Sequence, residues 1–256
     1  MIIISSKVFH QKKIFKNTYM QTNKDLFSEH IKRIDVLLQD YTPSLNSDTE
    51  YYAVIVEPRK IDEMVTIMKT VMYYLNETDS KIKWGLQIFH GLLNEKFIKE
   101  NTNEWGEVIY ENLNQNNLTN REYNDLLKTS EFWKKVRGKK ILIFQSDSIL
   151  LRTGIDEFLH YDYIGAPWIK PKENAYIGNG GLSLRTKETM ISITTSYQDE
   201  NESQEDIFFI TYLKENLPSI EIASQFSVED VYYHNPLGIH LSKKLDSELF
   251  LKILNK

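Results

Sequence analysis

Residues 51–144 alternate short apolar runs with amphipathic segments, and this alternation is the strongest constraint on the fold. The run YYAVIVE is apolar and β-branched, and Pro58 ends it. Such a run is typical of a strand buried on both faces of a parallel sheet. The segment that follows, to about Tyr74, predicts a helix, because its apolar side chains recur at helical spacing. These are Met64, Ile67, Met68, Val71 and Met72.

The same strand-then-helix pattern repeats toward residue 144. KWGLQIFHG is followed by LLNEKFIKEN, and WGEVIYENL precedes one amphipathic segment over residues 120–136. GKKILIFQSDS is the next predicted strand. Strands that alternate with helices predict a mostly parallel sheet with helices on both faces, which is a three-layer α/β/α architecture.

After residue 152 the pattern changes to short strand-like pieces joined by Gly and Pro. YDYIGAPW and YIGNGGLSLR are two such pieces, and SQEDIFFITYLKENL predicts a helix that stops before Pro218. We expect this half to build loops and short antiparallel strands over a site.

The first 48 residues are polar and weakly patterned. Their one clear helical segment is SEHIKRIDVLLQ, in which the apolar residues Ile31, Ile34, Leu37 and Leu38 recur at helical spacing. We therefore predict an N-terminal extension with a helix over residues 1–48 and a main domain over residues 49–256. The apolar run MIIISS is too short for a signal peptide, and no stretch reaches the length of a membrane span, so a cytoplasmic protein is expected.

The composition and charge of the chain exclude some kinds of partner and of catalytic or metal site. The chain has 256 residues, of which 41% are hydrophobic and 26% charged, as in ordinary globular proteins. A formal net charge of −5 argues against a nucleic-acid partner. The absence of cysteine excludes disulfides, thiol catalysis and thiolate metal sites, so a metal must bind to oxygen or imidazole.

Asp147 is the first candidate site residue, because it is a lone acid directly after an apolar strand. Gln145, Ser146 and Ser148 surround it. Asp147 either caps the following turn or presents oxygen to a hard divalent cation that also holds nucleotide phosphates. The carboxyl edge of an open α/β sheet is where ligands bind, which favours the second interpretation.

The segment GNGGLSLR has three glycines in four residues, so it is either a plain turn or a loop that approaches a ligand closely. It matches neither the phosphate-binding P-loop nor the dinucleotide fingerprint. Arg185 at its end either neutralises a phosphate or is a surface charge.

Two acids and two histidines complete the candidates. Glu205 and Asp206 lie at the start of a predicted helix. There they either interact favourably with the helix dipole or include a general base that faces the pocket. His234 and His240 either bind a metal or phosphate or are partly buried polar residues. Trp168 is a candidate for the cleft lining or for the core.

Several motifs together resemble a family of glycosyltransferase-like proteins related to the GT-A nucleotide-sugar transferases. The resemblance covers about residues 50–242 and is densest over residues 118–210. The motifs, in order, are LTNREYNDLLKTSEFWKKVRGKKILIFQSDSILLR, FLHYDYIGAPW, IGNGGLSLR, EDIFF and LGIH. It implies a single GT-A-like domain that binds a nucleoside diphosphate sugar at the carboxyl edge of its sheet, normally with Mn²⁺ or Mg²⁺.

The resemblance also assigns roles at the metal and donor ends of the site. The Asp-X-Asp motif of GT-A enzymes reads Gln145-Ser146-Asp147 here, so Asp147 inherits the metal role and the first acid is an amide. His240 resembles a late histidine that contacts metal or diphosphate. The remaining donor-binding positions are Glu57, Arg59, Gln145, Ser146, Asn179, Gly180, Gly181 and Arg185.

The pair Glu205 and Asp206 resembles the acids that supply the base in inverting members. The expected function is therefore transfer of a hexosyl or related sugar from a nucleoside diphosphate to a hydroxyl of a glycan or other acceptor. Two alternatives stay open. One is a degenerate transferase that binds a glycan or nucleotide without turnover, as Gln145 suggests, and the other is a metal-dependent nucleotidyltransferase or phosphohydrolase.

Overall fold

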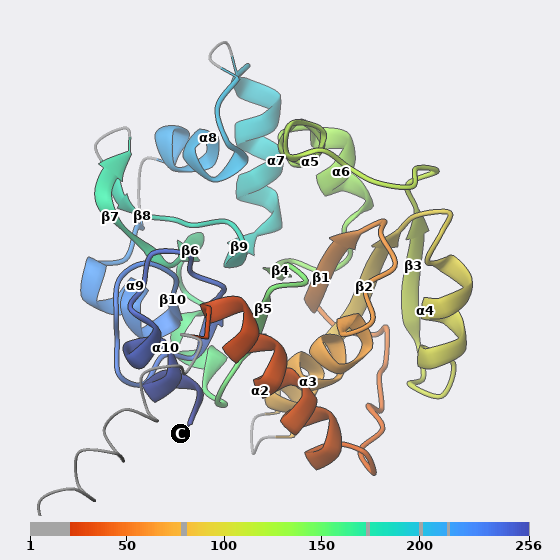
Figure 1. The fold of residues 1–256 in the computed structure, drawn as a ribbon. Coiled ribbons are helices and arrows are strands. Elements are labelled where there is room, and N and C mark those ends of the chain that lie inside the picture. The colour runs from red at the N-terminus through yellow and green to blue at the C-terminus, as the bar shows by residue number, and fades with distance from the viewer. Residues whose placement is uncertain (1–20, 78–80, 173–174, 200–201, 214–215, 256) are drawn as a thin grey trace, which may run out of the picture.

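A computed structural model describes residues 21–77, 81–172, 175–199, 202–213 and 216–255 and centres on a six-stranded sheet of order β3-β2-β1-β4-β9-β6 (Figure 1). The first four strands in that order are mutually parallel, and β9 is antiparallel to both β4 and β6. The predicted mostly parallel sheet is therefore confirmed. The strands are β1 (Tyr51–Glu57), β2 (Gly85–His90), β3 (Val108–Asn112), β4 (Lys140–Phe144), β6 (Tyr163–Gly165) and β9 (Leu182–Thr186).

Helices cover both faces of this sheet, above and below it in Figure 1. One face carries α2 (Asn23–Leu37), α3 (Met64–Asn76), α4 (Glu95–Thr102) and α10 (Ser247–Leu254). The other carries α5 (Asn120–Leu127), α6 (Ser130–Lys135), α7 (Lys187–Ser196) and α8 (Glu205–Tyr212). The three-layer architecture follows from strands that have no solvated face.

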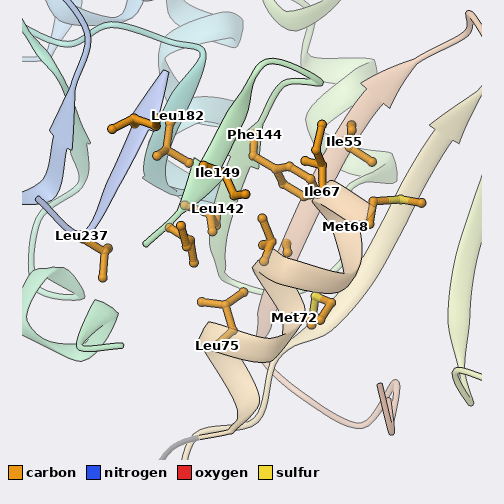
Figure 2. Close-up of a cluster of buried hydrophobic side chains, with 14 of the residues drawn as sticks. Ile55, Ile67, Met68, Met72, Leu75, Leu142, Phe144, Ile149, Leu182 and Leu237 are labelled. Atoms are coloured by element: carbon orange, nitrogen blue, oxygen red, sulfur yellow. The ribbon is translucent and has the colours of Figure 1, made fainter. Parts of the chain in front are cut away.

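Alternating strand residues feed the two apolar layers. In β1, Ala53 and Ile55 belong to the layer beneath α3, and Val54 and Val56 belong to the opposite layer. This is the two-residue period of an extended chain, with both sides buried. Figure 2 shows the first layer, where Ile67, Met68, Met72 and Leu75 of α3 lie over Ile55, Leu142, Phe144 and Leu182 of the sheet.

The rest of the chain adds small elements around this frame. A three-stranded sheet of order β10-β11-β5 and a β7-β8 hairpin lie beside the main sheet. Their bounds are β5 (Ser148–Leu150), β7 (Pro167–Lys172), β8 (Ala175–Ile177), β10 (Ser227–Val228) and β11 (Gly238–His240), with η2 (Ile155–Phe158) and α9 (Ile220–Phe226) between them. The predicted short antiparallel strands of the second half are confirmed by β9 and β11.

Two helix predictions need correction. Residues 120–136 form α5 and α6 rather than one helix, because the Thr129 hydroxyl accepts a hydrogen bond from the Phe132 N–H and starts a new helix. The helix expected up to Pro218 ends at Tyr212, since Leu213 takes an extended conformation.

Helix α2 begins earlier than predicted. Thr22 and Asp25 form a capping box at its start, a signal that the sequence pattern contains. Ile31 and Ile34 are buried in the same apolar cluster as β1 and α3, whereas Leu37 is 80% exposed and does not belong to the buried face. The domain division at residue 48 stays a prediction, and the run MIIISS lies outside the described residues. Within those residues, no helix is both long and apolar enough to cross a membrane.

Candidate functional site

The carboxyl ends of β1 and β4 open into a cleft of about 910 Å³. Antiparallel β9 begins at this same edge, so the loop before it, residues 178–181, lies against the loop after β4. The Gln145 N–H donates to the Gly181 carbonyl at 2.9 Å, and the Ser148 hydroxyl donates to the same oxygen at 3.1 Å. The topology thus brings the two predicted motif loops into direct contact.

Asp147 and His240 meet in this cleft because β11 pairs with β5. The register places His240 opposite Ser148, and the Leu241 N–H donates to the Asp147 carbonyl at 2.9 Å. Asp147 Oδ1 lies 3.3 Å from His240 Nε2. Two residues that are 93 positions apart in the sequence, at 147 and 240, therefore face the same point.

The electrostatics of this pair depend on burial and on a third residue, Glu229. Burial disfavours a charged imidazole, but Asp147 and Glu229 outweigh it and raise the pKa of His240 to about 10. Burial also works against ionisation of Asp147, yet contact with His240 keeps the pKa of Asp147 below its usual value. Glu229 Oε1 lies 3.4 Å from His240 Nδ1.

Asp147 and His240 fit a divalent cation as a pair. A separation of 3.3 Å is close to the ~3 Å between neighbouring ligands of an ion bound at about 2.1 Å. Oxygen and imidazole suit Mn²⁺ and similar ions. The described residues contain no group of three or more His, Cys, Asp or Glu side chains spaced to hold a metal. A cation here would therefore need further oxygens from a ligand or from water, as is common for Mg²⁺ at phosphate sites.

Asp206 lines the cleft from the first turn of α8. The residue is 7% exposed, and its Oδ2 accepts from the Gly180 N–H at 3.3 Å and its Oδ1 from the Ile207 N–H at 2.8 Å. Burial, reinforced by the negative charge of Glu205, raises the pKa of Asp206 to about 6. An acid with such a pKa is suited to take up and release a proton near neutral pH.

Glu205 is placed differently from its neighbour. Both of its carboxylate oxygens accept from the Arg185 guanidinium, at 2.6 and 2.9 Å, and both side chains are almost fully buried. Arg185 is 0% exposed and stacks among Tyr163, Phe209 and Trp133. Arg185 is therefore neither a surface charge nor a side chain that lines the cleft. Its charge neutralises that of Glu205.

The end of β1 forms a second paired group. Arg59 makes two hydrogen bonds to Glu57, at 2.8 and 2.7 Å, and the Ser146 hydroxyl donates to the same carboxylate at 3.0 Å. The Asn94 amide donates to the carbonyls of Glu57 and Arg59 and so ties down the strand end. Glu57, Arg59 and Ser146 all line the cleft, and their role in donor binding stays a prediction.

The loop of residues 178–181 needs its glycines for different reasons. Gly178 has a φ of +121°, which few other residues adopt. A Cβ at Gly181 would lie within 2.5 Å of the His240 ring. Asn179 bonds inward, accepting from the Gly181 N–H at 3.0 Å and donating to Glu229 at 3.0 Å.

Most sequence candidates converge on this cleft, and a few do not. Gln145, Asn179, Gly180, Gly181 and Trp168 line it, whereas His234 does not and instead packs its ring against Tyr233. The structure adds residues that sequence reasoning missed, which are Tyr123, Glu229 and Lys243. Lys243 follows His240 by three positions, a local signal that could have found it; Glu229 gives none.

Comparisons with known proteins were made for sequence and for fold. A model of the family described as "Protein of unknown function (DUF5672)" matches residues 107–240, more than half of the chain. No curated protein matches this sequence.

Solved structures with a similar fold are glycosyltransferases. The apo structure of the bifunctional glycosyltransferase WbbM matches with a TM-score of 0.51 at 8% identity, over 79% of this chain and 48% of that one. Apo GlyE of Streptococcus pneumoniae TIGR4 matches with a TM-score of 0.48 at 16% identity, over 76% and 55%. Residues 1–349 of S. aureus TarS in complex with UDP match with a TM-score of 0.40 at 14% identity, over 62% and 53%.

The matches cover about half the length of these three structures. Identities this low bear on the fold alone. The GT-A-like α/β/α fold predicted from the sequence is confirmed.

Proposed function

We propose that this chain, which belongs to the DUF5672 family, is a nucleotide-sugar-dependent glycosyltransferase. The residues that match the family model, 107–240, include Asp147, Asp206 and His240 of the cleft. One observation carries the proposal. A proton-accepting carboxylate, Asp206, lines the same cleft as an Asp147–His240 pair that fits a divalent cation. Metal-assisted, inverting transfer from a diphosphate uses both kinds of group.

The leaving-group end of the reaction is the Asp147 side of the cleft. Asp147 and His240 would hold Mn²⁺ or Mg²⁺, which neutralises charge that grows on a departing diphosphate. Arg59 and Lys243 line the same cleft, and Glu57 balances the charge of Arg59 there. Within the described residues no acid lies at ion-pair distance from Lys243, whereas the neighbouring Lys244 pairs with Asp230, so Lys243 is the lysine that we propose for contact with phosphate oxygens.

The acceptor end is the α8 side. Asp206 accepts the proton of an acceptor hydroxyl as that oxygen bonds to the sugar carbon and the bond from that carbon to the diphosphate breaks. Attack on the face opposite the leaving group gives inversion. The proposed acceptor is a hydroxyl of a glycan or similar compound, and Glu205 holds Arg185 in place rather than sharing the proton transfer.

Ligand binding tests the metal and nucleotide parts of this proposal. Thermal unfolding is measured with a panel of nucleoside diphosphates and their sugars, with and without Mn²⁺. A ligand at 100 times its Kd raises the free energy of unfolding by about 2.7 kcal/mol. We expect at least one nucleoside diphosphate to stabilise the protein more strongly when Mn²⁺ is present.

Asp147→Asn should abolish this Mn²⁺ effect because it removes a charged oxygen ligand, and the matched surface variant Asp156→Asn should keep it. The proposal is wrong if no nucleoside diphosphate binds, or if the Mn²⁺ effect survives in Asp147→Asn.

Gln145 favours a second candidate, a binding module without turnover, because an amide stands where a first acid is usual. The two functions differ in slow hydrolysis of a bound donor sugar, which an active site catalyses when water replaces the acceptor. Hydrolysis that is present in the natural chain and lost in Asp206→Asn excludes the binding module.

A further inference from the structure

Glu229 lies on the side of His240 opposite Asp147. Its Oε1 is 3.4 Å from His240 Nδ1, and its Oε2 accepts a hydrogen bond from the Asn179 amide at 3.0 Å. Asn179 in turn accepts from the Gly181 N–H at 3.0 Å. A continuous polar chain thus runs from the loop before β9 through Asn179 and Glu229 to the imidazole.

The imidazole has little freedom to turn away from this chain. Gly181 packs against the ring so closely that a Cβ there would lie 2.5 Å from it. His240 Nδ1 is buried and makes no hydrogen bond of good geometry to any described residue. A buried polar atom without a partner is costly, and the Glu229 carboxylate is the acceptor placed beside it.

A ring nitrogen that binds a cation must present its lone pair, so a cation that binds at Nε2 displaces the proton from that nitrogen and leaves the ring with one proton, on the other nitrogen. In this chain Nε2 faces Asp147 and Nδ1 faces Glu229. We infer that Glu229 is a positioning residue that holds the ring proton on Nδ1 of His240, which keeps Nε2 available beside Asp147 for a divalent cation. The inference rests on the cation role in the proposed function.

Asn179 has a matching part in this arrangement. By donating to Oε2, it turns the other oxygen, Oε1, toward His240. A glutamine at position 229 cannot serve both neighbours, because an amide has one oxygen. If that oxygen accepts from Asn179, the NH₂ group faces Nδ1 and favours the ring form that places the proton on Nε2.

The test is the Kd for Mn²⁺ alone, measured by electron paramagnetic resonance of free Mn²⁺ during titration of the full chain. Loss of a carboxylate behind a metal-binding histidine typically weakens metal affinity 10–100-fold, and we expect a change of that size for Glu229→Gln. Glu229→Asp keeps a carboxylate and should recover much of the affinity. Glu221→Gln, an identical change on the exposed side of α9, should bind like the natural chain.

The outcomes separate this inference from the proposed function. If the natural chain binds Mn²⁺ no better than Asp147→Asn does, both are overturned. If Mn²⁺ binding depends on Asp147 but Glu229→Gln binds as tightly as the natural chain, only the inference is overturned. If Glu229→Gln also lowers the thermal midpoint, the Mn²⁺ affinities of Glu229→Gln, Glu229→Asp and the natural chain are compared at the same folded fraction. An equal loss of Mn²⁺ affinity in Glu229→Gln and Glu229→Asp overturns the positioning role.

Discussion

At the scale of single residues, Glu205 and Asp206 are neighbours in sequence but differ in their surroundings. Glu205 is held by two hydrogen bonds from Arg185, which is buried among three aromatic rings. Among the described residues, no cation lies at hydrogen-bond distance from Asp206, and its carboxylate accepts only from backbone N–H groups there. The charge of Glu205 is therefore neutralised by a buried arginine, whereas Asp206 is a buried carboxylate with a raised pKa.

The buried ion pair predicts strong coupling between its two members. Glu205→Met or Arg185→Met alone should lower the free energy of unfolding by about 3–5 kcal/mol, because each leaves an uncompensated buried charge. Arg185→Met combined with Glu205→Met should cost less than the sum of the two single changes. Urea unfolding of the three variants measures this coupling. Simple additivity would show that the pair is not coupled.

Asp206 predicts a pH-dependent gain in stability when its charge is removed. Its pKa is about 6 in the folded protein and 3.8 for an unperturbed Asp, so ionisation above that range destabilises the folded state. Asp206→Asn should raise the free energy of unfolding at pH 8 by up to about 3 kcal/mol, and the gain should vanish near pH 4. Urea midpoints from pH 4 to 8 measure the difference between the variant and the natural chain, and a difference independent of pH contradicts the raised pKa.

At the scale of elements, α2 shows how the segment before β1 joins the main fold. It packs on α3 and α10, and the Asn23 amide donates to the carbonyls of Ser242 and Leu245. Buried side chains on one face of α2, such as Ile31, extend the apolar layer beneath the sheet.

This packing predicts unequal effects for two substitutions on the same helix. Ile31→Ala should cost about 2–5 kcal/mol, because Ile31 is 1% exposed and its loss leaves a cavity. Leu37→Ala should change stability by less than about 0.5 kcal/mol, since that side chain is 80% exposed. Chemical denaturation of both variants tests whether α2 is part of the core. Equal and small effects would show that residues 21–48 are an independent extension.

At the scale of the whole molecule, the cleft results from strand order and direction. Parallel β1 and β4 end at one edge, and antiparallel β9 begins there, so three loops from distant parts of the sequence converge. The small sheet β10-β11-β5 then places His240 and Glu229 beside Asp147. Neither an all-parallel sheet nor a different partner for β5 would assemble the same group.

Strands and helices that are encoded by local patterns could be predicted from the sequence. Apolar runs such as residues 51–57 must be buried, and residues 64–72 repeat at helical spacing, so strands, helices and layers could be predicted. An acid directly after a buried strand lies at the ligand-binding edge of the sheet, which identified Asp147. The break at Thr129 was missed because a capping side chain competes with an otherwise continuous helical pattern.

The partners of the charged groups could not be predicted from the sequence and are seen in the tertiary structure. Arg185 pairs with Glu205, and Glu229 lies beside His240. Among the described residues, no cation lies at hydrogen-bond distance from Asp206. In the sequence these five residues look alike, because each is a charged or polar residue near a glycine, a strand end or a helix start. The effect of a charge depends on its distance to other charges and on its removal from water, and both are properties of the folded chain. That is why the edge of the sheet that carries the cleft could be predicted from the sequence, while the distinction between the neutralised Glu205 and Asp206 with its raised pKa required the fold.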